Sequence, residues 1–192
     1  MQLQDKYSRR FNYLRLSITE SCNFRCNYCL PDGPDCTSRK EELTLPEIQR
    51  VVTAFAMAGT KKVRITGGEP ALRKDLTDII RICKETPGIE YVALTTNGYR
   101  LERDHDAWVE AGLDAINVSA DSLNPGTFQM ITGDSRLPSI LRGIDQALEK
   151  GHLKVKVNAV LLRDYNASEL PEFLQYIKEK DVSLRFIELM QT

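Results

Sequence analysis

The sequence has no long apolar segment and almost no net charge. It contains 26 Lys and Arg against 27 Asp and Glu, a formal net charge of -1. This balance does not indicate a protein that coats nucleic acid or adheres to a membrane surface. No apolar run approaches the roughly 20 residues that span a bilayer, and the first ten residues, MQLQDKYSRR, lack the apolar core of an export signal. We therefore expect a cytoplasmic protein that binds neither nucleic acid nor membrane.

Cysteine and histidine are also scarce. The chain has five cysteines, an odd number, and two histidines, His105 and His152. Without an export signal, this count does not indicate a disulfide framework. Three of the cysteines lie within eight residues, as Cys22, Cys26 and Cys29. We interpret these three as metal ligands.

Short apolar strands alternate with amphipathic helices along the chain, which is long enough at 192 residues for one ordinary domain. Strands are predicted over 13–19, 62–66, 91–96, 115–120, 154–160 and 183–189, and helices over 48–59, 75–85, 105–112, 139–151 and 168–180. Thr44 and Glu47 form a capping box before the first helix. Repeated strand–helix–strand units predict parallel pairing with right-handed crossovers, in an open doubly wound sheet or part of a (βα) barrel.

The polar faces of the strands help to choose between these two folds. Several strands alternate basic with apolar residues, whereas a parallel strand covered on both faces is normally hydrophobic throughout. If the apolar faces meet the helices, four cations point into a common lumen: Arg15, Arg64, Lys156 and Arg185. Such a lumen needs water or an anion, and these side chains suit phosphate oxygens. We therefore predict an α/β fold, an incomplete (βα)6 TIM-like barrel. The alternative is that each cation reaches solvent or pairs with a carboxylate such as Glu69 or Glu188.

The clustered cysteines form the pattern C-x3-C-x2-C directly after the first strand, which is the catalytic rim in a barrel. An iron–sulfur cube usually has four thiolate ligands, so three thiols leave one iron open for reaction. A structural zinc site with Cys36 as fourth ligand is the alternative. The iron–sulfur interpretation is favoured because both histidines lie far along the chain. Cys83, among isoleucines on a predicted helix, is expected in the core.

These residues resemble those of a known family. CNFRCNYC resembles the cluster loop of radical S-adenosylmethionine (SAM) enzymes, and RITGGEP at 64–70 resembles their GGE motif. The segments LTTNGYRL, NVSADSL, KVNAVLLRD and LRFIELMQT resemble, in order, the signatures of the GTP 3',8-cyclase subfamily of molybdenum cofactor biosynthesis. The resemblance runs from about Phe11 to the last residue.

The resemblance implies a set of binding residues and no catalytic side chain. Cys22, Cys26 and Cys29 would hold a [4Fe-4S] cluster whose fourth iron chelates SAM. The positions that match SAM contacts are Tyr28, Gly68, Ser119 and Met190. The positions that match GTP contacts are Arg15, Arg64, Thr95, Lys156 and, at the triphosphate, Arg185. The alternatives are that Thr95 and Ser119, at strand ends, are turn or cap residues and that Met190 packs in the core.

The implied reaction is reductive cleavage of SAM followed by conversion of GTP to (8S)-3',8-cyclo-7,8-dihydroguanosine 5'-triphosphate, a lyase-type activity. It requires an external one-electron donor and allows a homodimer. The family also has a C-terminal portion with three cysteines for a second cluster, and 1–192 matches only the radical SAM core domain. We therefore expect binding of the first cluster and SAM, with GTP cyclisation incomplete. The alternatives are a radical SAM enzyme for another substrate, such as a peptide, and a non-enzymatic electron-transfer module.

Overall fold

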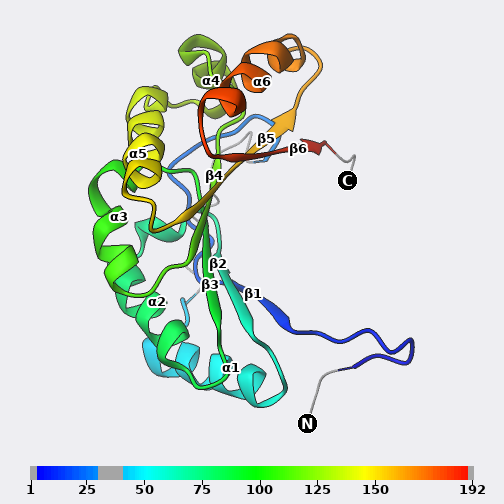
Figure 1. Ribbon diagram of the computed structural model, residues 1–192, viewed down its shortest axis with the longest axis vertical. Coiled ribbons are helices and arrows are strands. Elements are labelled where there is room, and N and C mark those ends of the chain that lie inside the picture. Colours follow the sequence, from blue (N-terminus) through cyan, green and yellow to red (C-terminus); the bar gives the residue numbers. More distant parts are fainter. Residues whose placement is uncertain (1–3, 30–40, 190–192) are drawn as a thin grey trace.

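The computed structural model describes residues 4–29 and 41–189, whose strands form one curved parallel sheet (Figure 1). The strands are β1 Tyr13–Ser17, β2 Lys62–Thr66, β3 Tyr91–Thr96, β4 Ala115–Ser119, β5 Lys154–Leu161 and β6 Ser183–Glu188. Their order in the sheet is their order in the chain. A doubly wound sheet reverses this order at a switch point, so the winding is that of a barrel. Within the described residues β1 and β6 do not pair, so the predicted incomplete (βα)6 barrel is confirmed.

The helices cover the convex side of the sheet and leave its concave side open (Figure 1). They are α1 Leu45–Met57, α2 Leu76–Glu85, α3 Leu101–Glu110, α4 Pro125–Thr132, α5 Leu137–Lys150 and α6 Leu170–Glu179, with 3-10 turns η1 Pro70–Leu72 and η2 Ala167–Glu169. None of the described helices is long and apolar enough to cross a membrane.

Two helices differ from the sequence prediction. The predicted 105–112 helix begins earlier, at Leu101. Leu101 is fully buried and belongs to the apolar face of the helix, but the charged residues that follow it hide this from the sequence pattern. Helix α4 was not predicted at all. It is short, but its punctuation is clear: the Asn124 side chain accepts hydrogen bonds from the N–H groups of the second and third residues after it, Pro125 occupies the first turn, and Gly133 ends the helix at a φ of 71°.

The core lies between the sheet and the helices. On β5 the buried side chains are Val155, Val157 and Ala159, each at most 4% exposed, whereas Lys154 and Lys156, which alternate with them, face the other side. The predicted alternation is therefore present, with the apolar face against the helices. Cys83 is fully buried in this core, as predicted, and burial raises the pKa of its thiol to about 12.

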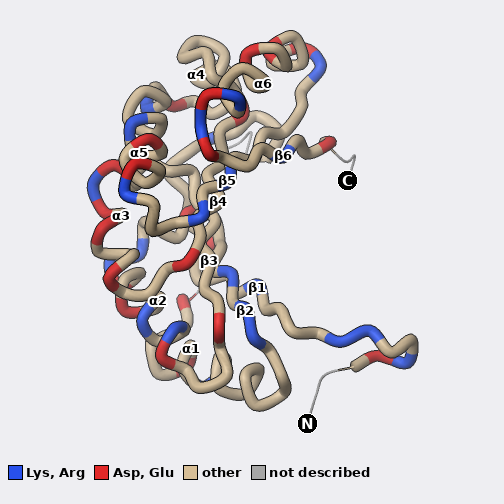
Figure 2. Tube along the Cα trace, in the orientation of Figure 1, with Lys and Arg blue, Asp and Glu red and all other residues tan. Residues whose placement is uncertain are grey.

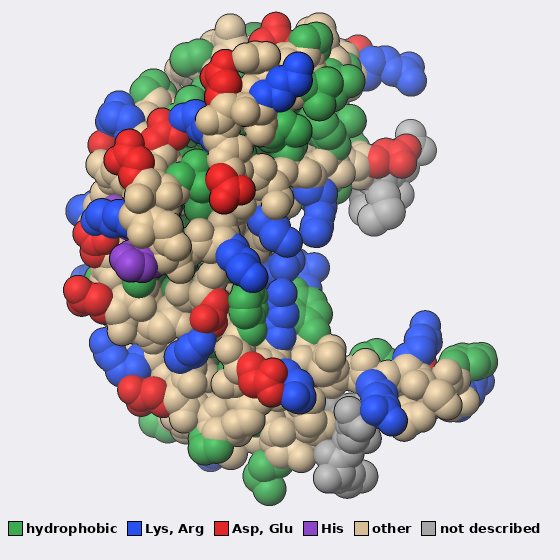
Figure 3. Space-filling view, in the orientation of Figure 1, with side chains coloured by type: hydrophobic (Ala, Val, Ile, Leu, Met, Phe, Trp, Pro, Cys, Tyr) green, Lys and Arg blue, Asp and Glu red, His purple; other side chains and the backbone are tan. Residues whose placement is uncertain are grey.

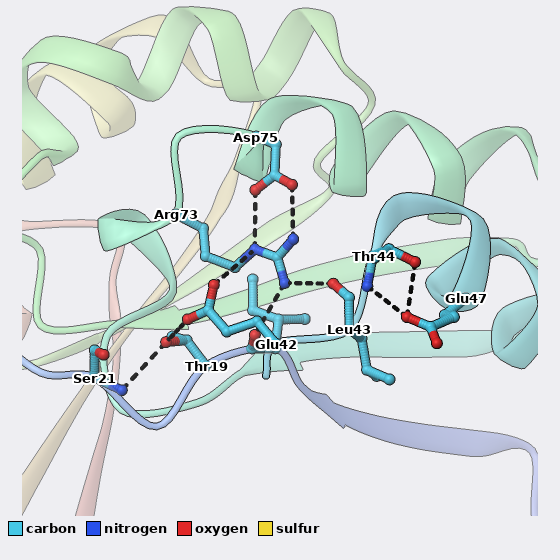
Figure 4. Close-up of polar contacts among 9 residues, drawn as sticks. Thr19, Ser21, Glu42, Leu43, Thr44, Glu47, Arg73 and Asp75 are labelled. Atoms are coloured by element: carbon cyan, nitrogen blue, oxygen red, sulfur yellow. Dashed lines mark hydrogen bonds and ion pairs between the residues drawn. The ribbon is translucent and has the colours of Figure 1, made fainter. Parts of the chain in front are cut away.

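Arg73 joins the end of β1 to the entrance of α1 (Figure 4). Its guanidinium donates to the Ile18 carbonyl (3.1 Å), the Leu43 carbonyl (2.8 Å) and the Asp75 carboxylate (2.6 and 2.9 Å). Beyond it, the Glu47 carboxylate accepts from the Thr44 N–H (2.8 Å) and hydroxyl (2.7 Å), in agreement with the predicted helix start. These bonds fix the base of the loop that follows β1.

Candidate functional site

The three clustered cysteines lie in the loop after β1, at the carboxyl edge of the sheet. Main-chain bonds tie this cluster loop, residues 20–29, to its neighbours. The Ser21 carbonyl accepts from Glu69 N–H (2.7 Å), and the Arg25 N–H donates to the Thr132 carbonyl (2.9 Å). Within the loop, the Cys29 N–H donates to the Cys26 carbonyl (3.0 Å). The fold therefore brings all three thiols to one mouth of the barrel, where the sequence predicted them.

The thiols are near enough to affect one another. Burial raises the pKa of Cys26 to about 12, and the charges of Asp121, Cys22 and Cys29 also act to raise it. Burial also raises the pKa of Cys22, with smaller contributions from Glu69 and Cys29. Thiols in this environment ionise only when a cation compensates the negative charge, as an iron–sulfur cluster does. The donor set thus fits the predicted metal centre.

Zinc was the alternative occupant of the three thiols. Among residues 4–29 and 41–189, no group of three His, Cys, Asp or Glu side chains is arranged to hold a single metal ion. The proposed fourth zinc ligand, Cys36, lies outside the described residues, as does Met190.

Gly68 lies directly against the cluster loop. A Cβ at this position would come within 2.3 Å of the Ser21 carbonyl oxygen and 2.6 Å of the Glu20 carbonyl oxygen. Only glycine allows this approach, because any side chain would push the two loops apart. The sequence analysis placed Gly68 at SAM, whereas the neighbour that requires glycine is the main chain of the cluster loop. Its contact with SAM stays a prediction.

Glu69 accepts several buried hydrogen bonds, a structural role that the sequence analysis did not identify. Its side chain is buried and accepts hydrogen bonds from Ala71 N–H (2.9 Å), the Thr96 hydroxyl (2.6 Å) and Asn97 N–H (2.6 Å). Burial raises the pKa of this carboxyl, and the hydrogen bonds oppose the rise. Glu69 therefore joins the loop after β2 to the end of β3, and it is not an ion-pair partner of Arg64. Its place in GGE was the only signal in the sequence.

Asp121 was also missed, and it holds Tyr28 of the cluster loop. The Tyr28 hydroxyl donates to one carboxylate oxygen (2.7 Å), and the Val160 N–H donates to the other (2.8 Å). Burial raises the pKa of Asp121, and burial beside this carboxyl raises the pKa of Tyr28. The fully buried Asn166 donates to the carbonyls of Asp121 (2.5 Å) and Val160 (2.7 Å). Asp121, 93 residues after Tyr28 in the sequence, thus connects the cluster loop to β5.

The predicted substrate residues share the concave face. Lys and Arg positions are blue along the inner strands of the trace in Figure 2, and in Figure 3 Lys and Arg side chains gather along the inner surface of the sheet. Arg15 is in register with Arg64, and Asn158 is in register with Arg185. Within the described part of the chain, no ion pair involves Arg15, Arg64, Lys156 or Arg185. The alternative of carboxylate partners thus finds no support in these residues.

Electrostatics and unpaired groups mark this face as a place for an anion. Burial lowers the pKa of Lys62, and the charges of Arg64, Lys156 and Lys154 lower it further. Arg64 Nε and Asn158 Oδ1 are buried without a hydrogen-bond partner. Groups of this kind are costly unless a ligand or water pairs with them. A polyanion with polar groups would satisfy both.

The two remaining predicted residues lie at or next to the ends of their strands, on the same face. Thr95 on β3 is in register with Asn117, which is in turn in register with Lys156. Ser119, the last residue of β4, is in register with Asn158. Both are half-buried. The fold thus places these candidates in register with Lys156 and Arg185 of the cationic strands, and their roles in binding stay predictions.

Comparison with known proteins defines the class. The family model of the Radical SAM superfamily matches residues 16–177, so the chain belongs to the radical SAM superfamily. The cofactors of this family are a [4Fe-4S] cluster and SAM, as the cysteine loop predicted.

The chain is also similar in sequence to curated GTP 3',8-cyclases. That of Actinobacillus pleuropneumoniae serotype 3 (strain JL03) is 60% identical over 192 residues, which are 100% of this chain and 56% of the relative. That of Vibrio parahaemolyticus serotype O3:K6 is 57% identical over 193 residues, 100% of this chain and 58% of the relative. The chain therefore spans little more than half the length of these relatives.

Solved structures support the fold alone, because their identity is low. Streptococcus suis SuiB bound to S-adenosylmethionine aligns with a TM-score of 0.79 at 18% identity, covering 94% of this chain and 41% of SuiB. Native anSMEcpe with bound AdoMet aligns with a TM-score of 0.73 at 18% identity, covering 93% of this chain and 52% of that one.

Proposed function

We propose that this chain is the radical SAM core, residues 1–192, of a GTP 3',8-cyclase that converts GTP to (8S)-3',8-cyclo-7,8-dihydroguanosine 5'-triphosphate. The observation that carries the proposal is the set of four concave-face cations without carboxylate partners among the described residues, Arg15, Arg64, Lys156 and Arg185. The triphosphate of GTP would provide the negatively charged partner for these four side chains. The curated relatives at 56–60% identity support the same assignment.

Different residues of the chain would bind the cluster, SAM and GTP. When bound, the cluster and SAM supply the one-electron chemistry that starts the reaction. Cys22, Cys26 and Cys29 would hold the cluster, and Tyr28, fixed by Asp121, would line the SAM side of the loop. The basic residues would hold the triphosphate and so aim the ribose at SAM. Because a reactive centre is productive only when it is close and correctly oriented, positioning is the main task of the protein.

Binding and full turnover are separate parts of the proposal. The chain spans about 56% of the length of the Actinobacillus relatives, and we propose that it binds the cluster, SAM and GTP but does not complete cyclisation alone. An external one-electron donor and a homodimer remain predictions, as do a cytoplasmic location and the absence of nucleic-acid and membrane partners.

Anaerobic reconstitution with iron, sulfide and SAM tests the proposal. With dithionite as reductant, we expect SAM cleavage that GTP stimulates and guanosine does not, with little cyclised product. Cyclised product at the rate of the longer relatives would refute the incompleteness. Cleavage that ignores GTP but responds to a peptide would favour the alternative radical SAM activity. A cluster that never cleaves SAM would favour the electron-transfer module.

A further inference from the structure

A second group of cations lies on the helix-covered side of the sheet, at the start of α3 and just before α5. Tyr99, Arg100, Arg103 and Arg136 line a pocket of about 270 Å³. The guanidinium carbons of Arg100 and Arg136 each lie 5.5 Å from the centre of the Tyr99 ring. We call these four residues, with Arg25, the basic patch. It belongs to a different face from the predicted GTP residues.

Charge in the basic patch is arranged with the cations outermost. Asp104 lies 2.6 Å from Arg103 and 3.7 Å from Arg100, and Asp134 lies 3.7 Å from Arg136. The side chains of Asp104 and Asp134 are only 23% and 13% exposed, whereas those of Arg103 and Arg136 are 66% and 49% exposed. Three guanidiniums therefore share two recessed carboxylates. An approaching molecule meets a positive surface, although the whole chain has a net charge of -1.

The basic patch adjoins the cluster loop. Exposed Arg25 lies between Cys22 and Cys26, and its N–H donates to the carbonyl of Thr132, four residues before Arg136 (2.9 Å). On the other side, the Asn97 side chain donates to that of Asn23 (2.9 Å) and accepts from the Tyr99 N–H (3.0 Å). Direct hydrogen bonds thus join the segment between two cluster cysteines to both sides of the patch.

We infer that the basic patch docks an acidic one-electron carrier protein, which reduces the cluster from the helix side. This inference rests on the proposed function, because only a redox cluster at Cys22, Cys26 and Cys29 needs such a partner. One electron leaves the reduced carrier and enters the cluster, and no atom or proton is transferred. Opposite charges at the rim of a transient interface mainly steer encounter, so the interaction weakens as salt rises.

The test uses reduced flavodoxin, a small acidic flavoprotein, as the probe. Arg103→Glu/Arg136→Glu reverses the two most exposed charges of the pocket. The matched control is Arg50→Glu/Arg81→Glu, which makes the same charge change at exposed sites on α1 and α2. Calorimetry with oxidised flavodoxin at low salt should show about tenfold weaker binding for the patch variant, and a change below about threefold for the control. Arg103→Gln/Arg136→Gln should give an intermediate loss if the reversed variant does not fold.

Two reductants separate this inference from the proposed function. With dithionite, the patch variant should cleave SAM at the wild-type rate; with reduced flavodoxin, its rate should fall about tenfold and recover at high flavodoxin concentration. Equal flavodoxin binding and equal flavodoxin-dependent rates in the patch and control variants would overturn the docking site, as would a wild-type protein that does not bind flavodoxin. Failure of the wild type to cleave SAM even with dithionite would instead contradict the proposed function.

Discussion

The concave and convex sides of the sheet both carry many charges, but they use them differently. On the helices, several cations pair with carboxylates, as in Arg142 with Glu102 (2.7 Å) and Lys150 with Asp106 (2.5 Å). On the concave face, the described basic residues of the strands have only each other and aromatic rings. Lys62, for example, lies 4.4 Å from the centre of the Tyr91 ring. Paired surface charges contribute little to stability, whereas a gathering of unpaired ones is costly without a ligand. The difference indicates which face is suited to binding a small anion.

The largest effect is expected at the cluster loop. Cys26→Ala removes one of three ligands, so we expect almost complete loss of bound iron and sulfide after anaerobic reconstitution. Cys83→Ala is the control, because this buried thiol belongs to the core. It should keep the cluster and lose about 1–2 kcal/mol of unfolding free energy. Similar iron contents in the two variants would contradict the assignment of the loop.

The next effect concerns the concave face. Lys156→Ala and Arg185→Ala should each weaken GTP binding by about tenfold or more, since a charge-assisted hydrogen bond contributes about 1.5–3 kcal/mol. Arg81→Ala, on the convex side and paired with Asp78 (2.7 Å), is the control and should bind GTP normally. Calorimetric titration checks all three variants. If the three bind equally, the two faces do not differ in function.

A smaller effect is expected at Glu69, whose buried carboxylate joins the loop after β2 to the end of β3. Glu69→Gln places an amide group where one carboxylate oxygen accepts hydrogen bonds, so a buried donor at Thr96 or Asn97 loses its partner. We expect a loss of about 1–3 kcal/mol in the free energy of unfolding, measured in urea. Glu90→Gln, at an exposed ion pair with Lys61, should change it by less than about 1 kcal/mol. If Glu69→Gln left the free energy of unfolding unchanged, the three hydrogen bonds would not support the loop.

The smallest effect distinguishes two substitutions of Asp121. Asp121→Ala removes both acceptors and frees the Tyr28 hydroxyl, so we expect SAM to bind several-fold more weakly. Asp121→Asn keeps one oxygen for the Val160 N–H and an amide that can donate to Tyr28, so its effect should be smaller. Equilibrium dialysis with SAM measures both. A larger loss for Asn than for Ala would mean that Asp121 does not act by holding Tyr28.

The strands of the sheet could be predicted from the sequence because the alternation of polar and apolar residues is a local pattern. Lys154, Val155, Lys156 and Val157 alternate residue by residue, and this period fixes both the strand and its two faces. The cysteine loop could be recognised for the same reason, since its three cysteines are neighbours in the chain. Helix α4 escaped detection because eight residues provide little periodicity, although its caps were visible.

Contacts between distant segments could not be predicted. The Tyr28–Asp121 bond joins residues 93 positions apart, and Glu69 meets Thr96 across 27 positions. Apart from the place of Glu69 in the GGE motif, nothing in the neighbouring sequence shows that either acidic residue is a buried acceptor and not a solvated charge. The basic patch has the same origin: Arg100 and Arg136 come together only because α3 and α5 pack side by side.

The most direct test of the central claim is a comparison of GTP and guanosine binding by the reconstituted protein over a range of salt concentrations. If the unpaired cations of the concave face hold a triphosphate, GTP binds far more tightly than guanosine, and the difference shrinks as salt rises. Equal affinities for the two ligands, or a difference that salt does not change, would contradict the claim.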